Sequence, residues 1–344
     1  MSEAAPRTRR VSMTDVARIA GVSQKTVSRV INDEPYVTDS VRERVLDVID
    51  RVGFRPNEAA RALVTQRTRR IGVVALGGTG FYGPTSVLAG VESVARGAGY
   101  ALSIMRTDPG EGADIQAAID ALAGQGAEAI VISEPVDFGR GPLSIPDGIE
   151  VLTFGMAPVT SSPRELVIGA DEEASSRDAT EHLLVQGHAT VHHISGPMNW
   201  LSSQRRREGW QRALADEGAP ITEPVEGDWT PAGGYAAMAV ILESGLCTAV
   251  FVANDQMAIG AMSAIQAAGL RVPEDVAVVG FDDIDVSAYL PVPLTTVRQD
   301  FAETSRIGMH RLLRALDGHA PESAHRTLRA HLVIRESSRS PSTR

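Results

Sequence analysis

Residues 12–32, SMTDVARIAGVSQKTVSRVIN, decide how the N-terminal part of the chain folds. Ser12 can cap a first helix, with Asp15 three residues later returning to the backbone N–H of the cap. Gly21 supplies the left-handed residue that ends many helices, and Ser23 can cap a second helix directly after it. Two short helices joined by so tight a turn predict a helix-turn-helix, whose second helix lies in the major groove of DNA.

The two helices of this motif have distinct apolar and polar faces. The apolar stripe predicted for the first helix consists of Val16, Ala17, Ile19 and Ala20. Arg and Lys side chains can reach guanine, and Gln can pair with adenine, so the polar face of the second helix is suited to reading bases. The candidate DNA contacts in and beside that helix are Ser23, Gln24, Lys25, Thr26, Ser28, Arg29 and Asn32. The alternative is a surface helix pair with solvated charges, and it leaves the agreement of caps, glycine and donors unexplained.

A third helix and a short fourth segment follow. Residues 38–52 carry apolar side chains at helical spacing, Val41, Val45, Leu46, Val48, Ile49 and Val52. Residues 57–66, NEAARALVTQ, are too few to form a stable helix alone. A helix that forms only when paired on DNA would place Leu63 as an apolar wedge in the minor groove, with Asn57 and Ala60 as neighbouring contacts. An ordinary linker helix remains the alternative.

Charge is distributed unevenly along the 344 residues. The net charge of −10 divides into +5 for residues 1–70 and −15 for the rest. A basic head on an acidic body is typical of a phosphate-contacting module carried by another domain. No apolar run reaches the length of a membrane span and no signal peptide is visible, so we expect a cytoplasmic protein, nucleoid-associated when it is bound to DNA. Cys247, the single cysteine, is expected to be a buried structural residue.

From residue 71 the pattern alternates between strands and helices. A first series begins with IGVVAL at 71–76, and a second begins near Leu166 with LVIGAD. Two such runs predict two doubly wound parallel α/β sheets, one in each lobe of the body. Ligands of open parallel sheets bind beyond the carboxyl ends of the strands, which here means the cleft between the lobes.

The sequence therefore predicts a DNA-binding head, a linker and a two-lobe body. The predicted divisions are a disordered basic tail at 1–11, the helix-turn-helix domain at 12–55, a hinge helix and linker at 56–70, an effector-binding and dimerisation domain at 71–336, and a disordered tail at 337–344. Within the body, the N-lobe is predicted at about 71–165 and 298–322, and the C-lobe at about 166–297 and 323–336.

Taken together, these stretches resemble the lactose-repressor (LacI) family of bacterial transcription factors. The resemblance rests on DVARIAGVSQKTVSRVIN and GFRPNEAARAL in the head, and on GDW, VANDQMAIGAM, VPEDVAVVGFDD and PLTTVRQDF in the body. The four body stretches are closest to the lactose-repressor branch of the family. The resemblance implies a periplasmic-binding-protein-like body and a homodimeric repressor, not an enzyme. It further implies a pseudo-palindromic operator and a saccharide that releases the repressor from that DNA.

The resemblance also implies particular site residues. In the head it assigns base reading to Gln24, Lys25 and Arg29, and the minor-groove wedge to Leu63. In the body it assigns effector binding to Phe81, Arg206, Trp229, Asn254, Asp282, Gln299 and Phe301. The residues themselves suit a sugar, because a carboxylate, a guanidinium and an amide bind hydroxyls while an aromatic ring covers a C–H face.

Two departures from the family pattern affect the pocket and the assembly. Gly155 stands where lactose-repressor-like sequences carry an Asp, and the loop GGTGFYG at 77–83 is rich in glycine. Both leave the identity of the sugar open. The end of the sequence, RESSRSPSTR, has no leucine heptads, which favours a dimer over a tetramer.

Other functions remain as alternatives. Gly78, Gly80 and Gly83 form a G-x-G-x-x-G that would suit a nicotinamide-dependent dehydrogenase, although the motif alone is weak and we expect no cofactor. A free sugar-binding protein of the periplasmic type would share the two-lobe body but not the head. A regulator of the same fold could instead respond to a purine or a phosphorylated metabolite as co-repressor. His192 and His193 point to opposite faces of a predicted strand, so we expect no metal site there.

Overall fold

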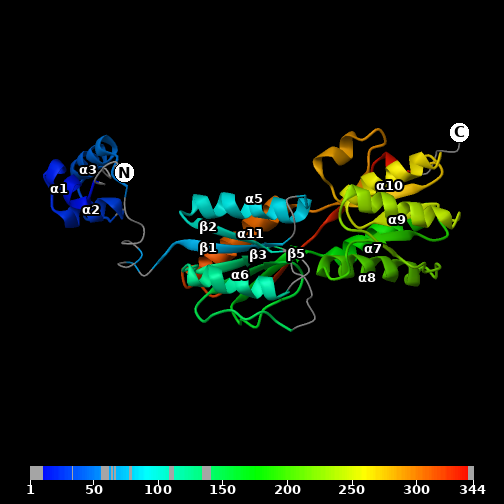
Figure 1. Cartoon of the computed structure of the whole chain (residues 1–344), viewed down its shortest axis with the longest axis horizontal. Helices are drawn as coiled ribbons and strands as arrows, with labels where there is room; N and C mark the ends of the chain where they lie inside the picture. Colours follow the sequence, from blue (N-terminus) through cyan, green and yellow to red (C-terminus); the bar gives the residue numbers. More distant parts are fainter. Residues whose placement is uncertain are drawn as a thin grey trace, which may run out of the picture. The chain divides into compact units, whose positions relative to one another are not determined.

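The computed structural model describes residues 11–32, 34–55, 67–76, 80–107, 112–133 and 141–339, together with Ala62 and Thr65. The chain divides into two compact units, a head up to Thr68 and a body from Arg69 (Figure 1). No helix within the described ranges is long and apolar enough to cross a membrane.

The head is a three-helix unit in which the side-chain caps of the first two helices follow the sequence prediction, whereas Thr38, expected to cap the third, makes no side-chain cap hydrogen bond. Its helices are α1 (Met13–Ala20), α2 (Gln24–Ile31) and α3 (Asp39–Val52). The capping box of α1 is complete: the Asp15 backbone N–H donates to Ser12 Oγ at 3.2 Å, and the Ser12 backbone N–H donates to Asp15 Oδ2 at 3.0 Å. Gly21 ends α1 with φ +67°, and Ser23 Oγ caps α2 by accepting the Thr26 backbone N–H. The predicted helix-turn-helix is confirmed.

The core of the head is smaller than the sequence suggested. Val16, Val27 and Val45 are fully buried at its centre. Ile19 and Leu46, which were predicted to be buried, are 42% and 46% exposed. Successive residues turn about 100° around a helix, and each of these two side chains lies about that far from the centre of its buried stripe.

The predicted hinge segment falls almost wholly outside the described residues. Asn57, Ala60 and Leu63 all lie there, and so does Gly78 of the glycine motif. Their assigned DNA contacts therefore remain predictions from the sequence.

The first lobe of the body, the N-lobe, contains a six-stranded sheet with the order β11-β5-β4-β3-β1-β2, all parallel. Its strands are β1 (Arg70–Leu76), β2 (Ala101–Thr107), β3 (Ala129–Ile132), β4 (Glu150–Phe154), β5 (Glu165–Ala170) and β11 (His325–Leu328). Its helices are α5 (Tyr82–Gly97), α6 (Gly112–Gly124) and α11 (Phe301–Leu316). Figure 1 shows α5 and α6 on opposite faces of this sheet, and α11 packs beside α5 over a shared apolar core.

The second lobe, the C-lobe, contains another six-stranded sheet, with the order β12-β10-β9-β8-β6-β7. Its strands are β6 (His192–Ser195), β7 (Val225–Glu226), β8 (Ala249–Val252), β9 (Ala277–Asp282), β10 (Thr295–Arg298) and the antiparallel β12 (His331–Val333). Its helices are α7 (Glu172–Val185), α8 (Leu201–Asp216), α9 (Pro231–Glu243) and α10 (Asp255–Ala267), with the short turns η1 (Asp285–Tyr289) and η2 (Glu336–Ser338). The pair α7 and α8 packs on one apolar cluster of this sheet, and the pair α9 and α10 packs on another, which also includes residues of β1, β3 and α6 of the N-lobe. The predicted class, a head followed by two doubly wound parallel sheets, is confirmed.

Two strands belong to a different lobe than predicted. The strand near Leu166 was expected to open the C-lobe, but β5 pairs in parallel with β4 and completes the N-lobe sheet. Likewise β11 pairs with β5 rather than joining the C-lobe. A buried parallel strand is apolar on both faces, so its sequence does not reveal which of two sheets it completes. The chain consequently crosses between the lobes after β5, after β10 and after β11, all within the continuously described residues 141–339.

Candidate functional site

The candidate recognition helix, α2, presents a polar face whose side chains differ in their exposure and in the contacts they make. Gln24 and Lys25 are exposed. Arg29 is half-buried, and its Nε lies 3.5 Å from Glu34 Oε2. An exposed ion pair of this kind is worth at most about 1 kcal/mol, so Arg29 can exchange it for a base edge.

The other predicted DNA contacts in and beside α2 carry hydroxyl and amide groups, and these groups form hydrogen bonds within the helix or at its ends. The Ser23 and Thr26 hydroxyls lie 2.9 Å apart at the N-terminus of α2, and Asn32 Nδ2 donates to Ser28 Oγ at 3.4 Å. Backbone N–H groups and small hydroxyls at a helix N-terminus contact phosphates in many DNA-binding proteins. Within α2 the structure therefore separates candidate base readers, Gln24, Lys25 and Arg29, from residues that shape and position the helix.

A pocket of about 730 Å³, its open mouth included, lies between the lobes of the body. It is formed where strands of both sheets end: Gly155 follows β4, Ala170 ends β5, and Asn254 and Asp282 lie at the ends of β8 and β9. The seven residues assigned to the effector all line it, namely Phe81, Arg206, Trp229, Asn254, Asp282, Gln299 and Phe301. The structure thus brings into one cavity residues that are up to 220 positions apart in the sequence.

Arg206 on α8 is at the centre of a buried polar cluster in this pocket. Its Nε and Nη2 donate to Glu172 Oε1 at 3.1 and 2.7 Å, and its Nη1 donates to the carbonyl oxygen of Ala253. Its Nη2 also lies 3.7 Å from Asp282 Oδ1. The guanidinium packs over the Phe281 ring at 3.9 Å. A guanidinium so surrounded is fixed in place, because its planar fork is satisfied on several sides.

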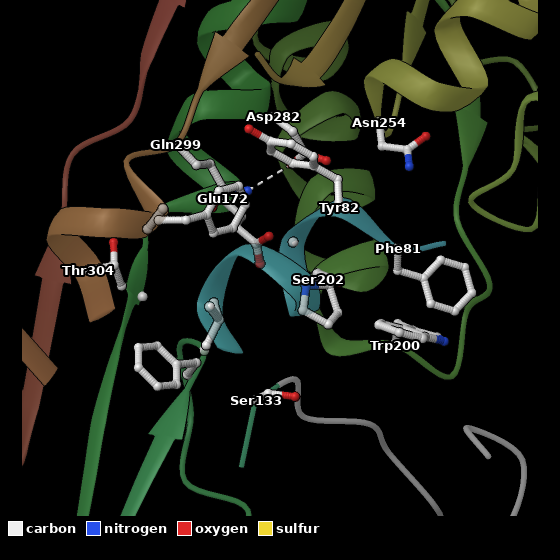
Figure 2. Close-up of a pocket in the computed structure, with 18 of the residues that line it drawn as sticks. Phe81, Tyr82, Ser133, Glu172, Trp200, Ser202, Asn254, Asp282, Gln299 and Thr304 are labelled. Atoms are coloured by element: carbon white, nitrogen blue, oxygen red, sulfur yellow. Dashed lines mark hydrogen bonds between the residues drawn. The ribbon is translucent and has the colours of Figure 1, made fainter. Parts of the chain in front are cut away.

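The carboxyl group of Asp282 has a raised pKa and lies on a strained backbone. Burial raises its pKa to about 6, although the Arg206 guanidinium and a hydrogen bond from Gln299 Nε2 at 3.0 Å act in the opposite direction (Figure 2). Its backbone φ is +111°, and that of Trp229 is +69°, a region that side-chain-bearing residues seldom occupy. Strain of this kind gathers at ligand sites, where the surrounding fold enforces it.

Asn254 and Trp229 are locked together on the C-lobe side. Asn254 Oδ1 accepts the Met257 backbone N–H and caps α10, while its Nδ2 donates to the Trp229 carbonyl oxygen at 3.1 Å. The Trp229 ring rests against Gly196, where a Cβ would lie 2.3 Å from the ring. Any larger residue at position 196 would displace this ring. The cap explains why Asn254 has two functions: it starts a helix and it orients a wall of the pocket.

Aromatic rings form the remaining walls. Phe81 lies edge-to-face with Trp200 at 5.6 Å between ring centroids, and Trp200 with Trp229 at 5.7 Å. On another side, Tyr82 lies edge-to-face with Phe301 at 5.8 Å. Pockets with aromatic walls and a few fixed polar groups are typical of small-molecule sites.

Several pocket residues were missed from the sequence. They are Tyr82, Ser133, Phe154, Glu172, Trp200, Ser202 and Thr304. Glu172 could have been found, because it follows the end of a strand as Asp282 does, but it stands in the run DEE with two other acids. Trp200 carried no comparable signal, since it precedes a helix rather than ending a strand.

Other expectations concern groups near the pocket. Asp283 does not line the pocket and pairs instead with Arg298 at 2.5 Å and Arg335 at 2.6 Å. His193 is stacked between Trp210 and Phe251, and burial lowers its pKa to about 4. Among the residues that the structure describes, no group of three or more His, Cys, Asp or Glu could hold a metal ion.

Comparison with known proteins agrees with this geometry. Residues 12–57 match "Bacterial regulatory proteins, lacI family", and residues 180–338 match "Periplasmic binding protein-like domain". The lactose operon repressor of Escherichia coli (strain K12) is 33% identical over 336 residues, which cover 97% of this chain and 92% of that protein.

Solved structures extend the likeness to the fold. The Lac repressor dimer bound to operator and the anti-inducer ONPF is similar with a TM-score of 0.83 at 29% identity, covering 96% of this chain and 99% of that chain. A complex of the transcriptional regulator CelR with cellobiose is similar with a TM-score of 0.68 at 27% identity, covering 95% and 100%. These relatives are transcriptional regulators, which sets aside the dehydrogenase alternative. The chain belongs to the LacI family of DNA-binding transcriptional repressors.

Proposed function

We propose that this repressor controls a carbohydrate-utilisation operon, and that a saccharide bound between its lobes releases it from the operator. The observation that carries the proposal is the polar cluster of Arg206, Asp282, Asn254 and Gln299, set among aromatic rings in one pocket. A carboxylate and an amide accept and donate hydrogen bonds to neighbouring hydroxyls, and rings cover the apolar face of a sugar.

The charge of the pocket favours a neutral ligand. The charged side chains of its described lining are Glu172, Arg206 and Asp282, so carboxylates outnumber cations. The guanidinium already donates two hydrogen bonds to Glu172. A phosphorylated metabolite would meet two carboxylates and an engaged cation, and burying such a charge without a partner is costly.

Release follows from the position of the pocket. Its walls come from both lobes, so a bound ligand stabilises one relative arrangement of the lobes over others. In the proposal, the ligand-free arrangement of the lobes lets the two heads of a homodimer bind the half-sites of a pseudo-palindrome, with paired hinge helices in the minor groove. The ligand-bound arrangement does not. A ligand that binds the released arrangement more tightly than the DNA-bound arrangement lowers operator affinity. The size of the effect is set by the ratio of the ligand's affinities for these two arrangements.

Two variants test the proposal. Arg206→Ala and Asp282→Asn should each abolish response to the sugar while operator binding survives, giving a permanent repressor. Arg205→Ala is the matched control, because Arg205 is the neighbour of Arg206 on α8 but is half-exposed, does not line the pocket and pairs with Glu208 and Glu173. Operator binding and its sugar response are measured by fluorescence anisotropy, with folding checked by circular dichroism.

The alternative is a co-repressor, such as a purine or a phosphorylated metabolite, that tightens operator binding. Under that alternative, well-folded Arg206→Ala and Asp282→Asn proteins would no longer repress the operon, because they could not bind the co-repressor. Constitutive expression of the operon in both variants would therefore overturn the saccharide-inducer proposal.

A further inference from the structure

The backbone that carries Asp282 into the pocket is strained at two successive residues. Asp282 has a φ of +111° and Asp283 a φ of +56°, both in the region that side-chain-bearing residues seldom occupy. Such a conformation is unfavourable and persists only where the surrounding groups enforce it. The groups that enforce it here therefore decide whether the Asp282 carboxylate keeps its contacts with Arg206 and Gln299.

A buried carboxyl group, that of Asp255, holds this backbone. Asp255 is the first residue of α10, next to the pocket residue Asn254, but its side chain is fully buried and is not part of the pocket lining. Its Oδ2 accepts the backbone N–H of Ile284, directly after the strained pair, at 3.0 Å. Its Oδ1 accepts the Thr296 hydroxyl at 2.5 Å, and Thr296 Oγ1 in turn accepts the Asp283 backbone N–H at 3.4 Å. One carboxylate thus holds two successive backbone N–H groups, one directly and one through a hydroxyl.

The fold accommodates this carboxyl group at a cost. Burial raises the pKa of Asp255 to about 7, whereas hydrogen bonds from the Ser287 hydroxyl, the Thr296 hydroxyl and the Ile284 N–H act in the opposite direction. A Cβ at Gly280 of β9 would overlap Asp255 Oδ1, so the strand carries a glycine where the carboxylate lies. Burying a carboxylate is costly, and a glycine inside a strand weakens that strand. Packing alone would be served better by an apolar side chain at position 255.

We infer that Asp255 is a positioning residue of the effector site, which holds the strained backbone at 282–283 and thereby keeps the Asp282 carboxylate in the pocket. Asp255 itself does not touch the ligand. It begins α10 beside Asn254, and its partner Thr296 belongs to β10, the strand that leads to Gln299. This inference rests on the proposed function, in which Asp282 binds a saccharide, and adds the residue that fixes the geometry of that contact.

The alternative is that Asp255 only stabilises the C-lobe by anchoring η1. Its third hydrogen bond serves that purpose, since the Ser287 hydroxyl of η1 donates to Asp255 Oδ2 at 2.6 Å. The two roles depend on different hydroxyl groups. Removing each hydroxyl in turn therefore separates them.

The test compares two variants that each remove one hydroxyl from the carboxylate and change no charge. Thr296→Val breaks the path from Asp255 to the Asp283 backbone. Ser287→Ala is the matched control, because it removes the anchor of η1 and leaves the other two hydrogen bonds of the carboxylate in place. Thr296→Ser keeps the hydroxyl and is the conservative rescue. Asp255→Ala is less informative, since it also removes a negative charge that acts on Asp282. Circular dichroism and thermal unfolding check the fold of each variant.

The first measurement is the pKa of Asp282 in the sugar-free, full-length protein, followed by NMR of isotope-labelled aspartate carboxyl groups and assigned with Asp282→Asn. In Thr296→Val the carboxyl group should become more hydrated, and its pKa should fall from about 6 to about 5 or below. In Ser287→Ala and Thr296→Ser it should stay at about 6. An unchanged pKa in Thr296→Val, or an equal fall in Ser287→Ala, would overturn the positioning role.

The second measurement is sugar affinity by calorimetry at about pH 8, above the pKa of both carboxyl groups. The probes are glucose, galactose, xylose, lactose, maltose and cellobiose. The tightest-binding of these should bind about tenfold more weakly to Thr296→Val, and unchanged to Ser287→Ala and Thr296→Ser. Equal sugar affinity in all three variants overturns the positioning role and leaves the saccharide function standing. If none of these sugars binds, the result counts against the saccharide function, and the pKa of Asp282 alone decides the positioning role.

Discussion

At the residue scale, Asp282 shows how burial and function meet in one side chain. Its carboxylate is deeply buried between Arg206 and Gln299, on a strained backbone, with a pKa raised to about 6. Desolvation is the main cause of the rise, because it disfavours the charged form. The proposed ligand contact requires the ionised carboxylate as an acceptor of hydroxyl hydrogens.

Effector binding should therefore depend on pH. Below about pH 6 Asp282 gains a proton, so sugar affinity measured by calorimetry should fall by about tenfold between pH 7 and pH 5. In Asp282→Asn the affinity should be weak at both values and should not change between them. A wild-type affinity that is constant over this range would show that the charge of Asp282 makes no contribution to binding.

Arg29 offers a second prediction at this scale. If its guanidinium leaves Glu34 to read a base, Arg29→Ala should weaken operator binding by about 1–3 kcal/mol and relax specificity at one position. Gel shifts on operator and on random DNA measure both effects. Equal losses on the two DNAs would identify a phosphate contact instead.

Residue identities could be predicted from the sequence where local chemistry decides them. The caps at Ser12 and Ser23 followed from spacing alone, because a capping contact spans three residues. Trp200 and Ser133 could not be found in this way. Their place in the pocket depends on how α8 and β3 are brought together across two sheets, which no local pattern encodes.

At the element scale, the presence of each helix in the head could be predicted from the sequence, but which of its apolar side chains are buried could be predicted less well. Each helix of the head was expected from caps and periodicity, yet Ile19 and Leu46 proved to be exposed. A short helix buries only a narrow stripe of side chains. Whether an apolar residue at the edge of that stripe is buried therefore depends on how the helices pack rather than on its hydrophobicity. The same limit applies to the hinge segment, where the residues allow either a linker or a DNA wedge.

The hinge assignment can be tested directly. Leu63→Ala should abolish the kink in the operator, because the side chain that separates two base steps is shortened, while effector affinity stays unchanged. DNA bending is measured by fluorescence energy transfer between labels at the operator ends. Unchanged bending would remove the wedge assignment and leave an ordinary linker helix.

At the scale of the whole molecule, the two-lobe class was predictable but the exchange of strands between lobes was not. The alternation of strands and helices indicated two parallel sheets, whereas β5 and β11 pair by contacts that a sequence of apolar residues does not distinguish. The exchange matters for function. It moves the first crossing between the lobes to the end of β5, where Ala170 and Glu172 line the pocket, while Gln299 and Phe301 line it beside the crossing after β10.

Assembly is the remaining question at this scale. Two heads are needed for the two half-sites of a pseudo-palindrome, so we expect a dimer at micromolar concentration. The edge strand β2, with Ile104 46% exposed, is one surface that a second copy would cover. Sedimentation velocity measures the state in solution. A monomer or a stable tetramer would contradict this expectation.

In the proposed function, a saccharide in the interlobe pocket releases the repressor from DNA. The most direct measurement is titration of common monosaccharides and disaccharides into the preformed repressor–operator complex, followed by fluorescence anisotropy of the labelled operator. We expect one of these sugars to lower operator affinity by about 5–150-fold, the usual range of coupling between two sites. Tighter operator binding with sugar, or a response only to a purine or phosphorylated metabolite, would contradict it.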